Sequence, residues 1–132
     1  MKSGILVLLT AAWICVFPAS VSAQSSSDWV DIKDPTQLRA LHSNKTFRGN
    51  GWTGHYRADG NYVFVLAGGE PRQGTWEVKG NDRVCTKRAD RPSAKCWRYQ
   101  SNRGKPDQFA VIDPDYDSLT RYFTVEDGIP KF

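Results

Sequence analysis

The chain has 132 residues, a formal net charge of +4 and 39% hydrophobic residues. This length supports one modest hydrophobic core and excludes an arrangement of several domains. The charge is only mildly basic, and by itself it identifies no class of partner.

The first 23 residues predict a cleaved signal peptide. Lys2 supplies a positive charge, an apolar run covers residues 5–17, and Val21-Ser22-Ala23 provides the small residues of a cleavage site. The apolar run is too short to span a bilayer permanently, and no later segment is apolar enough to do so. We therefore expect residues 24–132 to form one small β domain in the periplasm or outside the cell.

A short helix is predicted next. Asp34 can cap its start, and Pro35 suits the first helical position. Leu38 and Leu41 lie three residues apart and give the helix one apolar stripe. The helix is expected to end near Ser43-Asn44.

Short strands with turn signals between them follow the helix. Asp59-Gly60 and Gly68-Gly69-Glu70-Pro71 predict tight turns. Alternation in the middle of the chain places Trp76 and Val78 on one face of a strand. The expected strands are 52–58, 61–66, 73–79, 83–87, 95–100, 108–112 and 119–125. This pattern predicts an all-β fold: a small antiparallel up-and-down barrel or curled meander with one short N-terminal helix.

Two cysteines remain once the signal peptide is removed. In an exported chain, Cys85 and Cys96 predict a single disulfide. If they face each other in a hairpin, the same register places Val84 opposite Trp97. The sequence thus predicts both the bond and the alignment of the two strands.

Metal-ligand residue types occur without the spacing that a metal site requires. The two cysteines have no histidine nearby. Residues 113–117 start like a calcium loop, but Ser118 replaces the turn glycine and Thr124 replaces the closing glutamate. We read the segment as a polar turn, with weak calcium binding as the alternative, and we predict neither a metal site nor a cofactor.

His55 is the residue on which an enzymatic hypothesis would depend. Trp52 and Tyr56 match the core face of its strand, so we expect His55 on the opposite face, toward solvent or the mouth of a barrel. A small hydrolase using His55 with Asp59 is the alternative. No nucleophile motif or zinc-binding histidine pair accompanies them, and we predict no catalytic residue and no enzyme.

Charge is distributed unevenly along the second half. Residues 83–105 carry eight basic residues against one acid, a net charge of +7, whereas residues 107–127 carry a net charge of −5. Aromatic residues interleave with the basic ones, a pattern typical of contact with a polyanion or a sugar. The predicted binding surface, the basic aromatic strip, consists of Arg88, Arg91, Lys95, Trp97, Arg98 and Tyr99. The alternative is that the two charged segments pair with each other.

Several short motifs are similar to those of a known group of proteins. They are Lys45-Thr46-Phe47-Arg48-Gly49, Tyr56-x-x-Asp59-Gly60 and Gly74-Thr75-Trp76-x-Val78. With the signal peptide and the cysteine pair, their order resembles small exported proteins of Gram-negative bacteria, an uncharacterised family with a lipocalin-like β meander. The resemblance implies an envelope protein and supplies no catalytic residue.

These observations together predict a non-catalytic binding or interaction module. Its expected partner is an anionic cell-envelope glycan or lipid, or a partner protein. Nucleic acid is not expected, because the protein is predicted to be exported. The alternative within binding proteins is an inhibitor of lysozyme or another hydrolase, since periplasmic lysozyme inhibitors are also small disulfide-closed β-barrels.

Overall fold

The computed structural model describes residues 28–116 and 119–130, and the predicted signal peptide lies outside them. The elements, in chain order, are β1 (Trp29–Asp31), α1 (Pro35–His42), β2 (Lys45–Gly49), β3 (Trp52–Tyr56), β4 (Asn61–Leu66), β5 (Arg72–Lys79), β6 (Arg83–Arg88), β7 (Lys95–Asn102), β8 (Gln108–Ile112) and β9 (Thr120–Asp127). Within the described part of the chain, no helix has the length and apolarity that a membrane span requires.

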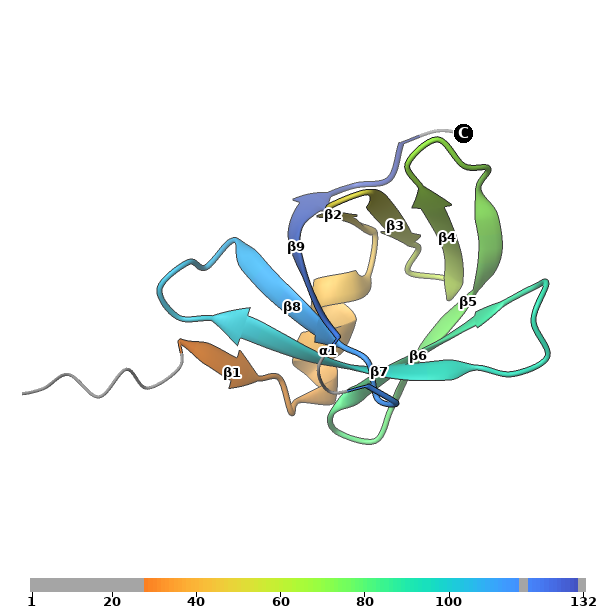
Figure 1. Ribbon diagram of the computed structural model, residues 1–132. Coiled ribbons are helices and arrows are strands. Elements are labelled where there is room, and N and C mark those ends of the chain that lie inside the picture. Colours follow the sequence, from red (N-terminus) through yellow and green to blue (C-terminus); the bar gives the residue numbers. More distant parts are fainter. Residues whose placement is uncertain (1–27, 117–118, 131–132) are drawn as a thin grey trace, which may run out of the picture.

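Strands β2 to β9 form a closed antiparallel barrel (Figure 1). Each strand pairs with its neighbour in sequence, and β2 pairs with β9 to close the ring, with Phe47 opposite Val125. Strand β1 lies along β7 with Trp29 opposite Asn102, beyond the segment of β7 that β6 covers. The all-β fold with one short helix is confirmed.

Two of these strands, β1 and β2, are not predicted by the sequence pattern. Strand β2 has five residues, of which Lys45, Arg48 and Gly49 give little strand signal. Its extended backbone is held by β3 on one side and by β9 on the other. Because β9 is distant in the sequence, the closure of the barrel depends on a pairing that no local pattern indicates.

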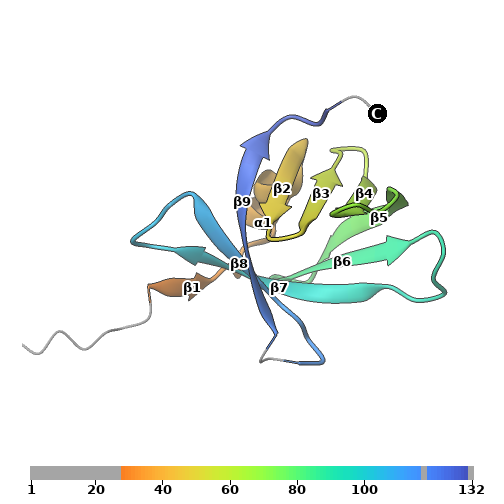
Figure 2. The same cartoon turned by 45° about the horizontal axis from the view of Figure 1, so that its top comes forward.

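Helix α1 matches its prediction and closes one end of the barrel; Figure 1 shows it within the ring of strands, and in Figure 2 it lies behind β2. The Asp34 carboxylate accepts the Thr36 N–H at 2.8 Å, which satisfies one of the free donors at the helix start. Leu38 is fully buried, and the helix packs against β2, β5 and β6. The apolar stripe of this helix therefore supplies part of the barrel core.

His42 is the central polar residue of this core, and the sequence analysis did not identify it. Its ring is fully buried, and the Nδ1–H donates to the Leu38 carbonyl at 2.7 Å. Among the residues that the structure describes, the Nε2 atom has no hydrogen-bond partner. Four aromatic rings surround it at centroid distances between 4.7 and 5.5 Å: Phe47, Tyr56, Trp76 and Tyr99. Burial lowers the pKa of His42 to about 3, so the ring is neutral at physiological pH.

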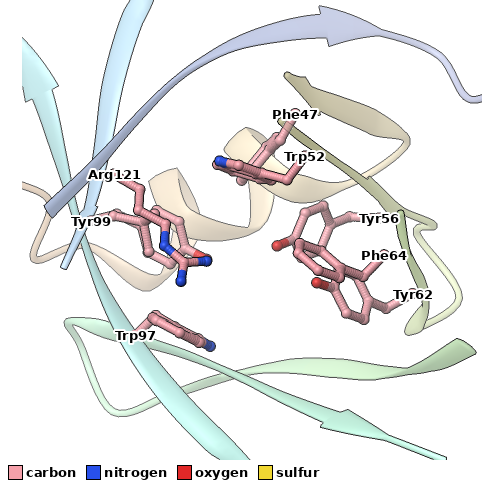
Figure 3. Close-up of a pocket in the computed structure, with 9 residues that line it drawn as sticks. Phe47, Trp52, Tyr56, Tyr62, Phe64, Trp97, Tyr99 and Arg121 are labelled. Atoms are coloured by element: carbon pink, nitrogen blue, oxygen red, sulfur yellow. The ribbon is translucent and has the colours of Figure 1, made fainter. Parts of the chain in front are cut away.

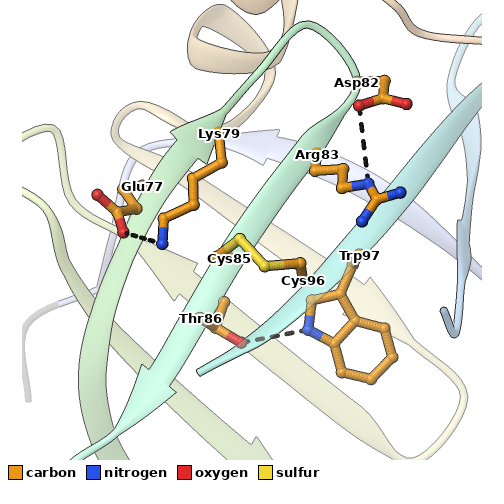
Figure 4. The surroundings of a disulfide bond; sticks show 8 residues. All are labelled: Glu77, Lys79, Asp82, Arg83, Cys85, Thr86, Cys96 and Trp97. Carbon is orange, nitrogen blue, oxygen red and sulfur yellow. Dashed lines mark hydrogen bonds and ion pairs between the residues drawn. A yellow bond between two sulfur atoms is a disulfide. The ribbon is translucent and has the colours of Figure 1, made fainter. Parts of the chain in front are cut away.

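The disulfide prediction is confirmed together with its register. Cys85 is bonded to Cys96 (Figure 4). Val84 lies opposite Trp97 in the same β6–β7 ladder. The Trp97 Nε1–H donates to the Thr86 hydroxyl at 3.2 Å, across the same pair of strands. The cross-link holds these two strands together on the approach to the β6–β7 connection.

Candidate functional site

The end of the barrel opposite α1 carries the candidate site, and we call this end the mouth. In an up-and-down barrel alternate connections lie at the same end, so the β2–β3, β4–β5, β6–β7 and β8–β9 connections surround the mouth. A cavity of ≈ 460 Å³ opens between them. It is lined by Tyr62, Phe64, Leu66, Thr86, Arg88, Arg91, Ser93, Ala94, Lys95, Trp97, Asp115 and Arg121.

A smaller cavity of ≈ 50 Å³ lies deeper, inside the barrel (Figure 3). Its walls are mainly aromatic: Phe47, Trp52, Tyr56, Tyr62, Phe64, Trp97 and Tyr99 surround it, together with Val111 and Arg121. The Trp52 ring can form part of this wall because residue 49 is a glycine: a Cβ atom at Gly49 would lie 2.0 Å from Nε1 of Trp52. Arg121 lines both cavities and therefore places a guanidinium where the aromatic interior meets the mouth.

Some of the cations at the mouth are paired with acids. Arg88 binds Asp90 at 2.6 Å and Lys95 binds Asp113 at 2.8 Å. The hydrogen bonds from Arg88 and from Lys95 lower the pKa of Asp90 and of Asp113, respectively. The Lys95–Asp113 pair shows that the basic and acidic segments do partly neutralise each other, as the alternative interpretation of the charge pattern held.

Two other cations at the mouth are not paired with an acidic side chain of the described residues. Arg91 and Arg121 have no ion-pair partner among residues 28–116 and 119–130. Both line the ≈ 460 Å³ cavity. Cations that line a cavity and have no acidic partner are suited to bind an anion.

The basic aromatic strip does not form one surface. Arg88, Arg91, Lys95 and Trp97 lie together around the mouth cavity. Arg98 instead lines a separate depression beside Asp31 and Asp82. Tyr99 is 2% exposed and belongs to the core, although its ring reaches the deeper cavity.

The reason for this correction is the alternation of side chains along β7. Residues 97, 98 and 99 are consecutive in an extended strand, so the middle one points to the opposite face. Trp97 and Tyr99 point into the barrel, which leaves Arg98 outside. The expectation that all six residues share one surface was therefore wrong for Arg98 and Tyr99.

Arg121 is the site residue that the sequence analysis missed. It is the single basic residue in the acidic segment 107–127, and that segment was not considered as part of a cationic site. Its strand carried a usable signal: Arg121 lies two residues before Phe123, which is buried, and four before Val125, which packs against the core. A period of two thus places Arg121 on the inward face.

Three tyrosine hydroxyls lie in the interior below the mouth. Tyr56 is hydrogen-bonded to Tyr62 on one side and to Tyr99 on the other. Burial raises the pKa of all three well above the ordinary value of 10, so each hydroxyl keeps its proton at physiological pH. Figure 3 shows the Tyr56 and Tyr62 hydroxyls directed toward the cavity.

His55 is buried, which corrects the expectation that it faces solvent or the mouth. Its ring is 3% exposed, and Nδ1 lies 2.9 Å from the Thr46 hydroxyl. That hydroxyl donates to the Gly128 carbonyl at 2.8 Å, so the histidine Nδ1–H is the donor to Thr46. Gly128, which follows β9, is thus hydrogen-bonded across the outer face of β2. The alternation of polar and apolar residues along the sequence does not indicate this packing.

Asp59, the second member of the proposed His55–Asp59 pair, is bonded within its own turn. Asp59 accepts hydrogen bonds from the N–H and the side-chain amide of Asn61, at 2.9 and 3.0 Å, within the β3–β4 turn. Burial lowers the pKa of His55, and the positive charges of Arg48 and Arg57 lower it further. The bond to Thr46 and the lowered pKa are those of a neutral histidine with a structural contact.

The described residues contain no group of three or more His, Cys, Asp or Glu side chains placed to hold a metal ion. In the segment considered for calcium, Asp113 binds Lys95 through one oxygen and accepts the Asp115 N–H through the other. Residues 117 and 118 of that segment lie outside the described residues. The observed bonds are those of a capped polar turn.

The chain was also compared with known proteins. No protein-family model, no curated protein and no solved structure matches it. The similarity of its motifs to a family of exported Gram-negative proteins stays a prediction, and the functional argument is based on the geometry of the mouth.

Proposed function

We propose that this protein is an exported, non-catalytic binding module that takes an anionic cell-envelope glycan or lipid at the mouth of its barrel. The observation that carries the proposal is the position of Arg91 and Arg121. Both line a cavity of ≈ 460 Å³, and neither has an ion-pair partner among the described residues.

The composition of the walls supports the same function. Aromatic rings and cations line the cavity together, and Lys95 Nζ lies 4.6 Å from the centre of the Trp97 ring. Such walls bind ligands that combine an acidic group with a flat or apolar surface. The proposal names no catalytic residue, because His55 and Asp59 are engaged in separate structural contacts.

The experiment compares two variants that remove the same charge from different ends of the barrel. Arg91→Gln/Arg121→Gln changes the mouth, whereas Arg103→Gln/Lys105→Gln changes the exposed β7–β8 connection at the α1 end. Each protein is titrated with outer-membrane glycolipid and with an acidic envelope oligosaccharide, at low and at physiological salt.

We expect the mouth variant to lose at least tenfold in affinity, since a hydrogen bond to a charged group is worth roughly 1.5–3 kcal/mol. The control variant should bind like wild type. Binding should also weaken as salt rises, because exposed charges are screened over about 8 Å at physiological ionic strength. Equal binding by the two variants, unaffected by salt, would contradict the proposal.

A further inference from the structure

The large apolar side chains that are exposed gather at the mouth. Within residues 28–116 and 119–130 they are Leu66, Tyr116, Leu119 and Tyr122, with exposed fractions from 51% to 61%. Leu66 ends β4, Tyr116 and Leu119 belong to the β8–β9 connection, and Tyr122 lies near the start of β9. Each of these positions is at the mouth end, where exposed apolar groups indicate a binding surface.

A second depression, of ≈ 410 Å³, lies beside the cationic cavity. It is lined by Asn50, Gly51, Trp52, Leu66, Thr120, Arg121 and Tyr122. Trp52, Leu66 and Tyr122 give it an apolar surface. Leu66 and Arg121 line both hollows, so the apolar depression and the cationic cavity are neighbours around one guanidinium.

The tyrosine hydroxyls do not supply a free donor at the mouth. The hydrogen bond to Tyr56 raises the pKa of Tyr62, so Tyr62 donates to Tyr56. The bond between Tyr56 and Tyr99 raises the pKa of Tyr56 and lowers that of Tyr99, so Tyr56 donates to Tyr99. The remaining O–H is that of Tyr99, which lies in the core, and an acidic group at the mouth is therefore bound by the arginines.

Charge near Tyr62 favours an anion at the same point. The positive charges of Arg88 and Arg121 act on the Tyr62 hydroxyl and oppose the rise in its pKa that burial causes. Arg88 is already bound to Asp90, whereas Arg121 has no ion-pair partner in the described part of the chain. An acidic group in the cavity would accept hydrogen bonds from the Arg121 guanidinium.

We infer that the ligand at the mouth is a single-chain anionic amphiphile. Arg121 and Arg91 bind its acidic head group, and its hydrocarbon chain lies over Trp52, Leu66 and Tyr122. This inference rests on the proposed function and narrows its ligand from glycan or lipid to a lipid-like molecule. The head group is a carboxylate or a phosphate ester, since both accept hydrogen bonds from a guanidinium.

The apolar depression favours a lipid over a glycan. The cationic cavity has polar walls that include Ser93 and Asp115, and it does not by itself distinguish the two ligands. The neighbouring depression offers leucine and aromatic surface instead. Burial of hydrocarbon against that surface contributes about 25 cal/mol per Å².

The experiment uses the mature protein and four probes below their micelle concentrations: dodecyl phosphate, dodecanoate, the neutral dodecyl maltoside, and glucuronate, which has no chain. Binding is measured by calorimetry and by the fluorescence of Trp52 and Trp97, which line the two hollows. Far-UV circular dichroism verifies that each sample stays folded. An acidic envelope oligosaccharide is titrated in parallel.

We expect at least one of the two anionic amphiphiles to bind, and the neutral one and glucuronate to bind at least tenfold more weakly. The tighter of dodecyl phosphate and dodecanoate identifies the head group. Arg121→Gln should lose roughly tenfold in affinity, and Leu66→Ser should lose severalfold. Arg103→Gln is the matched control for Arg121→Gln: it removes the same charge from the exposed β7–β8 connection at the α1 end, and it should bind like wild type.

Two results would overturn the inference in distinguishable ways. If the oligosaccharide binds through Arg91 and Arg121 while neither anionic amphiphile binds, the inference fails and the proposed function stands. If no anionic probe binds at all, both fail. Equal affinity for dodecyl phosphate and dodecyl maltoside, or unchanged binding by Arg121→Gln, would also refute the head-group site described here.

Discussion

His42 makes the stability of the barrel depend on pH. Its folded-state pKa is about 3, whereas an unperturbed histidine titrates near 6.5. Between these values the unfolded chain binds a proton that the folded chain excludes, so protonation favours unfolding. The stability that comes from the neutral ring is complete above pH 6.5 and is lost progressively as the pH falls toward 3.

The size of the stability loss follows from the difference between the folded and the unfolded pKa of His42. Each pH unit below 6.5 costs about 1.4 kcal/mol until the folded-state pKa is reached. At pH 4.5 the loss attributable to His42 is therefore about 3 kcal/mol, a large part of the stability of a small domain. Asp59, Asp90 and Asp113 have pKa values below the ordinary 3.8 and stay ionised at pH 4.5, so they contribute little over this range.

The variant for this test is His42→Phe. Phenylalanine keeps an aromatic ring among Phe47, Tyr56 and Tyr99 but cannot titrate. The free energy of unfolding is measured by urea denaturation at pH 7.5 and at pH 4.5 for wild type, His42→Phe and His55→Gln. Wild type should lose about 3 kcal/mol more than His42→Phe between the two pH values.

The His55→Gln variant separates the two histidines. Burial also lowers the pKa of His55, so this variant should reduce the pH dependence in the same direction. If wild type and His42→Phe lose the same free energy of unfolding between pH 7.5 and pH 4.5, the fold does not force His42 to be neutral. An NMR titration that places the pKa of His42 near 6.5 would refute the reasoning directly.

Three further predictions concern the covalent and steric features of the chain. Replacing Cys85 and Cys96 together by Ala should lower the free energy of unfolding by about 3 kcal/mol, measured by thermal denaturation; an unchanged midpoint would show that the cross-link contributes nothing. Gly74→Ala should destabilise the barrel by roughly 1–3 kcal/mol, because the added Cβ would lie 2.3 Å from the Lys87 carbonyl oxygen, a backbone atom that cannot move aside freely. Mass spectrometry of the exported protein should give an N-terminus at or near Gln24, and an uncleaved chain would contradict the signal-peptide prediction.

Local sequence was enough to determine several parts of the fold. The start of α1 needed only Asp34 and Pro35, and the β3–β4 turn needed Gly60, whose φ of +91° is accessible mainly to glycine. The pairing of Cys85 with Cys96 determined the β6–β7 register. In each case the partners are close in the sequence, and the pattern itself contains the geometric constraint.

The site was predicted only in part, for a related reason. Segment 83–105 indicated the cations at one wall of the mouth, and Arg88, Arg91, Lys95 and Trp97 do lie there. The apparent continuity of the basic aromatic strip was misleading, since alternation along β7 separates Arg98 from its neighbours. Net charge along a segment does not indicate which face of a strand carries it.

What the sequence determined by itself is the class of fold, the helix, most of the strands and one disulfide. Tertiary structure alone decided the closure of the barrel by β2 and β9 and the burial of His42 and His55. These features depend on contacts between residues far apart in the chain, such as Thr46 with Gly128. Their free energy arises only when the ring closes and excludes water, so no local pattern of residues can encode them.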